Sequence, residues 1–180
     1  QTGSDNDAQA GVYYDSNANV IGVSQGGSGN EAYAYADDDS NRNVIGVSQN
    51  GTDNYAYAEA YDDSNRNVIS VSQNGSDNEA YAWAENDSSD NTGLISQNGS
   101  GNFGETFIGD DNGDNNFTAI AQNGMDNYAY VDNYTDTTGN TTGILQNGSD
   151  NDAEVYLDED ADRNVTEIVQ NGSNNDAEVE

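Results

Sequence analysis

Short runs of this chain alternate apolar or small residues with polar ones. In the run 43–49, every second residue lies on one face, and these are Asn43, Ile45, Val47 and Gln49. In the run 54–60, the matching face holds Asn54 followed by alanines. Alternation with a period of two, bounded by residues that favour turns, predicts β-strands. Alanine also favours helix, but such short runs without 3.6-residue spacing are poor helix candidates, so we expect strands.

The motif Q-x-G-x-x-N marks a repeat that runs through the whole chain. Its eight glutamines lie 24 residues apart, except for one interval of 25 residues. They are Gln1, Gln25, Gln49, Gln73, Gln97, Gln122, Gln146 and Gln170. A fixed period of this length predicts a stack of similar supersecondary units. The extra residue falls in the connector 109–115, which leaves the neighbouring strands in register.

We predict an all-β fold, a two-sheet β-solenoid in which stacked strand–turn–strand rungs form an amyloid-like cross-β arrangement. Residues 50–53, with the sequence NGTD, predict the turn within one rung, because Asn and Gly tolerate positive φ. The whole chain, 1–180, forms one such solenoid. It has a half repeat at 1–18 and repeats at 19–42, 43–66, 67–90, 91–115, 116–139, 140–163 and 164–180.

Stacking places like residues on like, about 4.8 Å apart. The amides of the asparagine that starts the first strand, of the motif glutamine and of the motif asparagine would then bond their counterparts above and below. With the motif glycine, they form the predicted structural ladder. Its members are Asn19, Gln25, Gly27, Asn30, Asn43, Gln49, Gly51, Asn54, Asn67, Gln73, Gly75, Asn78, Gln97, Gly99, Asn102, Gln122, Gly124, Asn127, Gln146, Gly148, Asn151, Gln170, Gly172 and Asn175.

Composition alone would indicate a disordered chain, because only 32% of residues are hydrophobic and the formal net charge is -31. The regular repeat overrides that interpretation. The chain has three arginines but no lysine, histidine or cysteine, which excludes disulfides and His or Cys metal sites. So acidic a chain is a poor partner for nucleic acid, and no apolar run is long enough for membrane insertion as a helix.

The same composition leaves little for catalysis. Without His, Cys or Lys, only carboxylate pairs could perform acid–base chemistry, and a regular two-sheet stack predicts no concave pocket. We therefore expect that the protein is not an enzyme. Because the sequence starts at Gln1 rather than Met, we expect a mature, secreted form from which a signal peptide has been removed.

Written out, each copy reads N-x5-Q-x-G-x-x-N-x-A, and Gln49, Gly51, Asn54 and Ala56 carry this pattern in one copy. It resembles the curlin repeat, S-x5-Q-x-G-x-x-N-x-A-x3-Q, of the secreted curli subunits that build bacterial functional amyloid. Here asparagine replaces the opening serine, and alanine or another residue, such as Ala60, replaces the closing glutamine. The resemblance implies an extracellular fibre on the cell surface, with a curli-type export and nucleation machinery as partners.

Acidic residues gather in the connectors between repeats. One interpretation is a solvated, soluble edge, and the other is binding of calcium or another divalent cation by stacked carboxylates. No EF-hand spacing is present, and no other cofactor is expected. The candidate cation contacts are Asp37, Asp38, Asp39, Asp62, Asp63, Asp110, Asp111, Asp158 and Asp160.

Aromatic residues align on the outward face of the second strand. Tyr33, Tyr57, Tyr81 and Trp83 form this surface aromatic strip. It either stabilises neighbouring strands or provides a surface for lateral bundling or adhesion.

The three arginines, at positions 42, 66 and 163, all lie directly before a first strand. From there they could reach the acidic connectors of neighbouring repeats. We expect charge pairs within the stack, each of them weak because it is exposed.

Open solenoid ends expose strand edges that template further pairing. The sequence has no proline and no change of composition near Glu180 that would indicate a cap. We therefore expect a secreted structural subunit that assembles with itself, head to tail, into an extracellular curli-like amyloid fibre for biofilm matrix, adhesion or surface coating. The alternatives are a monomeric acidic β-solenoid adhesin and a calcium-binding repeat module.

Overall fold

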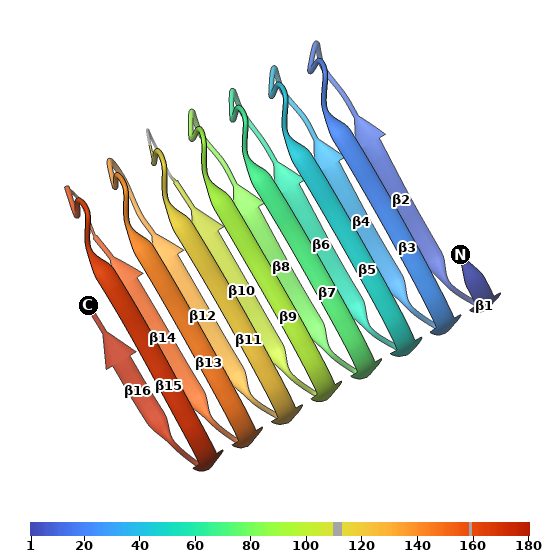
Figure 1. Cartoon of the computed structure of the whole chain (residues 1–180). Coiled ribbons are helices and arrows are strands. Elements are labelled where there is room, and N and C mark those ends of the chain that lie inside the picture. The colour runs from blue at the N-terminus through green and yellow to red at the C-terminus, as the bar shows by residue number, and fades with distance from the viewer. Residues whose placement is uncertain (110–112, 159) are drawn as a thin grey trace.

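The computed structural model describes residues 1–109, 113–158 and 160–180. Across those residues the chain is all-β, with two parallel sheets of eight strands each and no helix. The coils stack on one another, so that the chain advances from one end of the molecule to the other (Figure 1). The predicted two-sheet β-solenoid is therefore confirmed.

Each rung contributes its first strand to sheet A and its second strand to sheet B. Sheet A contains β1 (Thr2–Ser4), β3 (Val20–Ser28), β5 (Val44–Thr52), β7 (Val68–Ser76), β9 (Thr92–Ser100), β11 (Phe117–Met125), β13 (Thr141–Ser149) and β15 (Val165–Ser173). Sheet B contains β2 (Asp7–Val12), β4 (Glu31–Ala36), β6 (Tyr55–Ala60), β8 (Glu79–Ala84), β10 (Phe103–Ile108), β12 (Tyr128–Asn133), β14 (Asp152–Leu157) and β16 (Asp176–Val179).

Every strand pairs in parallel with the strand one repeat away, and equivalent residues lie side by side. In sheet A, Gln49 of β5 pairs with Gln25 of β3 and with Gln73 of β7. The register holds across the 25-residue interval, where Gln97 pairs with Gln122. The extra residue is therefore accommodated in the connector after β10, part of which (110–112) lies outside the described residues.

The turn between the two strands of a rung is tighter than the sequence predicts. Strand β5 continues through Asn50, Gly51 and Thr52 and pairs there with β7. The corner is made by Asp53, whose φ is 54°, and Asn54. The predicted turn at 50–53 therefore includes the corner residue Asp53 and the positive φ of Gly51 (130°), but residues 50–52 belong to the strand. Asn-Gly is a signal for a hairpin, which would have ended the strand earlier. A solenoid corner joins strands of different sheets, so each strand keeps its parallel partner up to the corner.

The inner faces of the two sheets form a thin apolar core. Sheet A contributes residues such as Ile45 and Val47, and sheet B contributes alanines such as Ala56 and Ala58, all of them at most 3% exposed. The small residues of one sheet leave room for the larger residues of the other, which fills the narrow space between them. Buried amides and hydroxyl groups close this core at both ends.

Candidate functional site

The motif glutamines form a continuous hydrogen-bonded ladder inside the corner. The Nε2 of the buried Gln49 donates to Gln73 Oε1 (2.9 Å), to the Asn54 carbonyl of its own rung (3.0 Å) and to the Glu31 carbonyl of the preceding rung (2.9 Å). One amide therefore joins three rungs and both sheets. The glutamine-to-glutamine bond recurs at every step from Gln1 to Gln170, with N–O distances of 2.8–3.0 Å.

The motif asparagines form a second ladder, which runs with the opposite polarity. Asn54 Nδ2 donates to Asn30 Oδ1 of the preceding rung (2.9 Å), and Asn78 donates in turn to Asn54 (2.9 Å). Asn54 Nδ2 also donates to the Gly75 carbonyl of the next rung (3.0 Å). In the amide-to-amide bonds, each glutamine thus donates to the glutamine on its C-terminal side, whereas each asparagine donates to the asparagine on its N-terminal side.

The asparagines that start the first strands do not form the predicted amide-to-amide ladder. Asn43 Oδ1 accepts from the backbone N–H of Asn67 (2.8 Å), and its Nδ2 donates to the Ser64 carbonyl (2.8 Å). Asn19, Asn91, Asn116 and Asn140 have the same kind of partners. The side chain lies beside the connector and supplies hydrogen-bond partners to backbone groups there.

The motif glycines form a column in which neighbouring rungs are too close for any side chain. Gly51 has a φ of 130°, and a Cβ added there would lie 1.9 Å from the carbonyl oxygen of Gly75. The same clash, at 1.7–1.9 Å, occurs at each step from Gly3 to Gly148. Glycine is therefore required by the stacking itself, and the same Gly75 carbonyl accepts the bond from Asn54.

The connectors contain a buried hydroxyl column that the sequence analysis did not include. Ser40, Ser64 and Ser88 have no exposed surface, and Thr137 occupies the equivalent place. The Ser64 N–H donates to Ser40 Oγ (3.1 Å), and Ser64 Oγ lies 3.2 Å from Ser88 Oγ. The signal was available, because a small residue stands three positions before each strand-start asparagine, such as Asn67.

The predicted aromatic strip is in contact along sheet B, and it is part of a larger surface. The ring centroids of Tyr33 and Tyr57 lie 6.2 Å apart, and those of Tyr57 and Trp83 lie 5.1 Å apart in a stacked arrangement. Tyr81 also contacts Trp83, at 6.3 Å. We call the connected rings the aromatic band; it comprises Tyr13, Tyr33, Tyr35, Tyr55, Tyr57, Tyr81, Trp83, Phe103 and Tyr128.

Tyrosines of sheet B donate hydrogen bonds to carboxylates two residues away on the same strand. Tyr33 donates to Glu31, Tyr57 to Glu59 (2.7 Å) and Tyr156 to Glu154. The hydrogen bond to the Glu31 carboxylate is the largest of the causes that raise the pKa of Tyr33 to about 12. Burial of its carboxyl group raises the pKa of Glu59. The outer face of sheet B therefore combines neutral phenols with carboxylates.

The acidic connectors are exposed or partly exposed, and their geometry does not converge on a metal site. Within residues 1–109, 113–158 and 160–180, no group of three or more acidic side chains could hold a metal ion. Asp110 and Asp111 lie outside the described residues. The other candidates, spread along the stack, are Asp37, Asp38, Asp39, Asp62, Asp63, Asp158 and Asp160.

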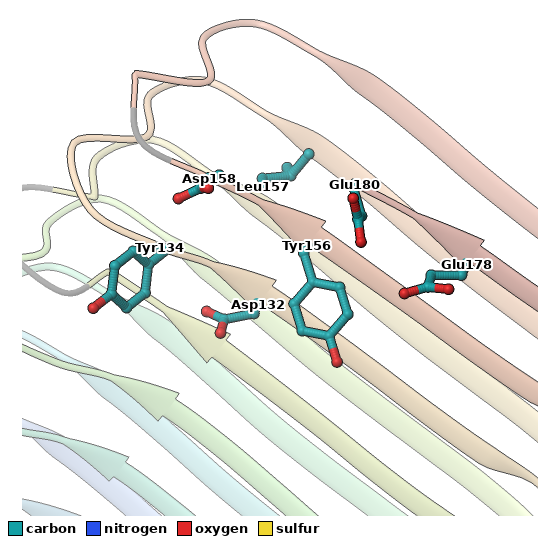
Figure 2. Close-up of a pocket in the computed structure, with 7 residues that line it drawn as sticks. All are labelled: Asp132, Tyr134, Tyr156, Leu157, Asp158, Glu178 and Glu180. Atoms are coloured by element: carbon teal, nitrogen blue, oxygen red, sulfur yellow. The ribbon is translucent and has the colours of Figure 1, made fainter.

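One hollow lies on the outer side of sheet B near its C-terminal end (Figure 2). Figure 2 shows the Tyr156 ring with Asp132 on one side and Glu178 and Glu180 on the other. Tyr134, Leu157 and Asp158 complete the lining. Carboxylates therefore dominate this hollow, so that it would repel an anionic ligand.

The arginines do not all pair with acidic residues as expected. Among the described residues there is one ion pair, in which Arg66 donates to both Asp90 oxygens at 2.7 and 2.6 Å. This pairing lowers the pKa of Asp90. Arg42 stands one repeat before Arg66, and the described residues include no carboxylate within 4.0 Å of Arg42 or Arg163. Identical repeat positions stack like charges together, and a partner exists only where the neighbouring repeat has aspartate.

The outer face of sheet A differs from that of sheet B. The strands of sheet A contain one charged residue, Glu167, whereas those of sheet B contain only acidic ones. The charged residues in the strands of sheet B are Asp7, Glu31, Glu59, Glu79, Glu105, Asp132, Asp152, Glu154, Asp176 and Glu178. The outward residues of sheet A are mainly valine, glycine, serine, alanine and asparagine.

No protein-family model matches the chain, and no curated protein or solved structure matches it significantly. No helix among the described residues has the length and apolar character that crossing a membrane requires.

Proposed function

We infer that this protein is a structural subunit that assembles with copies of itself, head to tail, into an extracellular fibre of the curli type. The proposal rests on one observation above all, the opposite polarity of the two amide ladders. In the bonds between like side-chain amides, each internal glutamine donates toward one end of the stack and each internal asparagine toward the other. The two ends of the stack are therefore different from each other and complementary.

At the C-terminal end, Gln146 donates to Gln170, and Gln170 Nε2 donates to the Asp152 carbonyl. The next rung would supply the glutamine oxygen to which the internal glutamines donate. At the N-terminal end, Gln1 donates to Gln25, and the glutamine of a preceding rung would donate to the Gln1 oxygen as the internal glutamines do to one another. Placing Gln1 of one copy after Gln170 of another continues the ladder in the same direction. In this ladder, joining two C-terminal ends would set donor against donor, and joining two N-terminal ends would set acceptor against acceptor.

The backbone hydrogen bonds at the two ends of the stack also leave room for further strands. Internal rungs exchange bonds in both directions, as when the Val20 N–H donates to the Asn43 carbonyl (2.8 Å) and the Gly29 N–H donates to the Ser4 carbonyl (3.1 Å). In the described residues, β1 and β2 are bonded on one side only, as are β15 and β16. Exposed parallel edges of this kind template further strands. Copies added at these edges would extend both sheets.

Charge sets the conditions under which such growth proceeds. Eight rungs at ~4.8 Å span roughly 38 Å, so a formal net charge of -31 amounts to about 0.8 charge per Å. Duplex DNA carries about 0.6 charge per Å. We therefore expect little polymerisation in low-salt, chelator-treated buffer at neutral pH. High salt, calcium or acidification should restore it.

Electron microscopy of the purified chain after addition of salt tests the proposal. Fibres with a diffraction spacing near ~4.7 Å are expected. Compact particles that never elongate would instead indicate a monomeric solenoid, such as an adhesin or a calcium-binding module. Calcium that acts where sodium of equal ionic strength does not would identify specific carboxylate sites.

A variant at the growing end sharpens the test. In the single chain, a Cβ added at Gly172 meets only Asn175 Nδ2, at 3.8 Å, whereas equivalent internal glycines meet the next carbonyl. The φ of 112° at Gly172 strains alanine locally, so the variant should be less stable than the parent chain while keeping the rest of the stack. We expect that Gly172→Ala folds but blocks addition of the next copy, whose Gly3 would occupy the clashing position. Ser173→Ala, on the neighbouring residue, is the matched control and should grow normally. Unchanged elongation of Gly172→Ala, with folding verified by circular dichroism, would contradict head-to-tail growth in this register.

A further inference from the structure

An apolar ridge runs along the outer face of sheet A. Val20, Val44 and Val68 lie in register on neighbouring strands and are 62%, 46% and 40% exposed. Further along the stack the column alternates between threonine and exposed apolar residues, in the order Thr92, Phe117, Thr141 and Val165. Three consecutive exposed valines in so polar a chain form an apolar patch of the kind that often marks an interaction surface.

A groove lies beside the three valines, two residues further along β3, β5 and β7. It is lined by Gly22, Gly46 and Ser70, with Ser24 and Ser48 on its far side. An added Cβ at Gly22 would meet no atom within 4 Å, and at Gly46 only Ser70 Oγ, at 4.0 Å. The backbone there is extended, so that nothing within the chain requires glycine.

Glycine inside a strand normally weakens it, because glycine has no side chain to pack and loses the most backbone freedom on folding. It often marks a place where another surface approaches the strand closely. The motif glycines have such a reason within the chain, since a Cβ at Gly51 would lie 1.9 Å from the Gly75 carbonyl. Gly22, Gly46 and Gly143 have none, which points to a contact from outside the chain.

Charge determines which occupant fits this face. The strands of sheet A carry only Glu167, at the last rung, while the chain as a whole has a formal net charge of -31. Two copies that met through sheet B would bring its carboxylates together and remove them from water, which is costly without a compensating cation. Of the two outer faces, sheet A is therefore the one through which two such acidic chains can approach each other.

The face is also large enough. Seven of its strands have nine residues each. At ~3.3 Å per residue and ~4.8 Å between strands, they cover about 1,000 Å² on each copy. A stable interface between two proteins buries about 1,200–2,000 Å² in total, counted over both partners. Two facing copies reach this range without contributions from the connectors.

We propose that two copies of this solenoid pair laterally through the outer faces of sheet A, with the valine ridge of each copy seated in the glycine groove of the other. Over β3, β5 and β7, the ridge of Val20, Val44 and Val68 and the groove lie in adjacent columns that follow the stack. A twofold axis parallel to the stack exchanges the two columns, so that each ridge meets the partner groove. A twofold axis along the strands would instead set ridge on ridge. The paired solenoids therefore point in the same direction, and pairing does not require growth at their ends.

Cysteine cross-linking tests this geometry, because the chain has no native cysteine. A mixture of Val44→Cys and Gly46→Cys proteins should form a disulfide-linked dimer on mild oxidation. Each variant alone should cross-link less, since a ridge residue faces a groove residue. Tyr57→Cys, on the outer face of sheet B, is the matched control. No enrichment of the mixed dimer over this control, or preferential cross-linking of Tyr57→Cys, would overturn the proposal.

Filling the groove gives a second readout. In the triple variant Gly22→Val, Gly46→Val and Gly143→Val, each new side chain points into open space, so that the single solenoid should melt no earlier than the parent chain. The ridge of a partner could no longer enter, and sedimentation velocity at high salt should show at least a tenfold weaker dimer. In fibre preparations, single filaments should replace paired ones while end growth continues. If the folded triple variant pairs as strongly as the parent chain, the proposed interface is wrong. If the variant loses end growth but pairs as weakly as expected, the result counts against the proposed fibre function and not against the interface.

Discussion

The two outer faces of the solenoid arise from the same repeat and yet differ in chemistry. Sheet B carries the aromatic band and ten carboxylates within its strands, whereas the strands of sheet A carry Glu167 alone and one aromatic residue, Phe117. Their inner faces are joined by the same glutamine ladder. The comparison shows that stacking restricts which residues can occupy the core and the corner of each rung. Residues on the two outer faces are not restricted in this way, so the faces can take different roles. Experiments that alter one region and spare the other test this division.

The largest contrast lies between two kinds of glycine. Gly75→Ala places a Cβ 1.9 Å from the Gly99 carbonyl at a φ of 127°, so we expect a loss of about 4 kcal/mol in the free energy of unfolding. Gly46→Ala adds a Cβ in open space on the outer face of sheet A and should stabilise the single solenoid by about 0.5 kcal/mol. Denaturant unfolding of both variants gives the measurement. Equal losses would remove the distinction between the two columns.

The inner and outer amides offer the next contrast. Gln97 accepts from Gln73 (2.9 Å), donates to Gln122 (3.0 Å) and is 1% exposed. Gln97→Leu leaves neighbouring buried amides without partners and should lower the free energy of unfolding by about 2–3 kcal/mol. Asn98→Ala removes an exposed amide on sheet A that accepts from Asn74 (3.1 Å) and donates to Asn123 (3.5 Å). Because water can replace these exposed bonds, the free energy of unfolding should change by less than about 0.5 kcal/mol. A comparable loss from Asn98→Ala would show that the outer ladder also holds the stack together.

Acidity should act on sheet B and spare sheet A. Burial raises the pKa of Glu59 and of Glu105 above the ordinary value of 4.5. Protonation of these groups therefore favours the folded state. Their contribution to the free energy of unfolding should be fully present below pH 4.5 and should be lost as the pH rises through their raised folded-state pKa values. We expect a higher melting temperature at mildly acidic pH and a flatter pH profile in Glu59→Gln with Glu105→Gln. The control, Ser48→Ala with Ser72→Ala on sheet A, should keep the parent profile; an identical profile in the glutamine variant would refute this assignment.

The smallest effect concerns the exposed ion pair in the connectors, away from both faces. Arg66 and Asp90 are 50% and 42% exposed, and water and salt screen their attraction. Arg66→Gln should lower the melting temperature slightly at low salt and not at all at high salt. Arg66 lowers the pKa of Asp90, so the stabilisation from this ion pair is present above pH 3.8, the ordinary pKa of aspartate. It is lost as the pH falls below that value and Asp90 becomes protonated. Arg42→Gln, at a position without a carboxylate partner among the described residues, serves as the reference, and an equal response of both variants would argue against the pair.

Much of the fold follows from particular residues in the sequence. The alternation of Ile45 and Val47 with polar residues predicts a strand, and the 24-residue spacing predicts that this strand stacks on its copies. The positions of Gln49 and Asn54 in every copy predict amides in register. These features depend only on the order of residues within one repeat and on the spacing of the repeats. The structure predicted for one copy therefore applies to all copies.

The tertiary structure alone decided how closely the rungs meet and which atoms they use. The strand runs on to Thr52 because its parallel partner continues there, which no local turn signal reveals. Asn43 bonds backbone groups of a neighbouring connector, and the ring of Tyr57 stacks on Trp83 of the adjacent column. These contacts depend on distances between residues one repeat apart and on the rotamers that fit between two backbones. The sequence by itself determined that like would stack on like. Only the three-dimensional packing decided that Gly51 has no room for a side chain while Gly46 faces open space, because that difference is set by the path of the neighbouring rung.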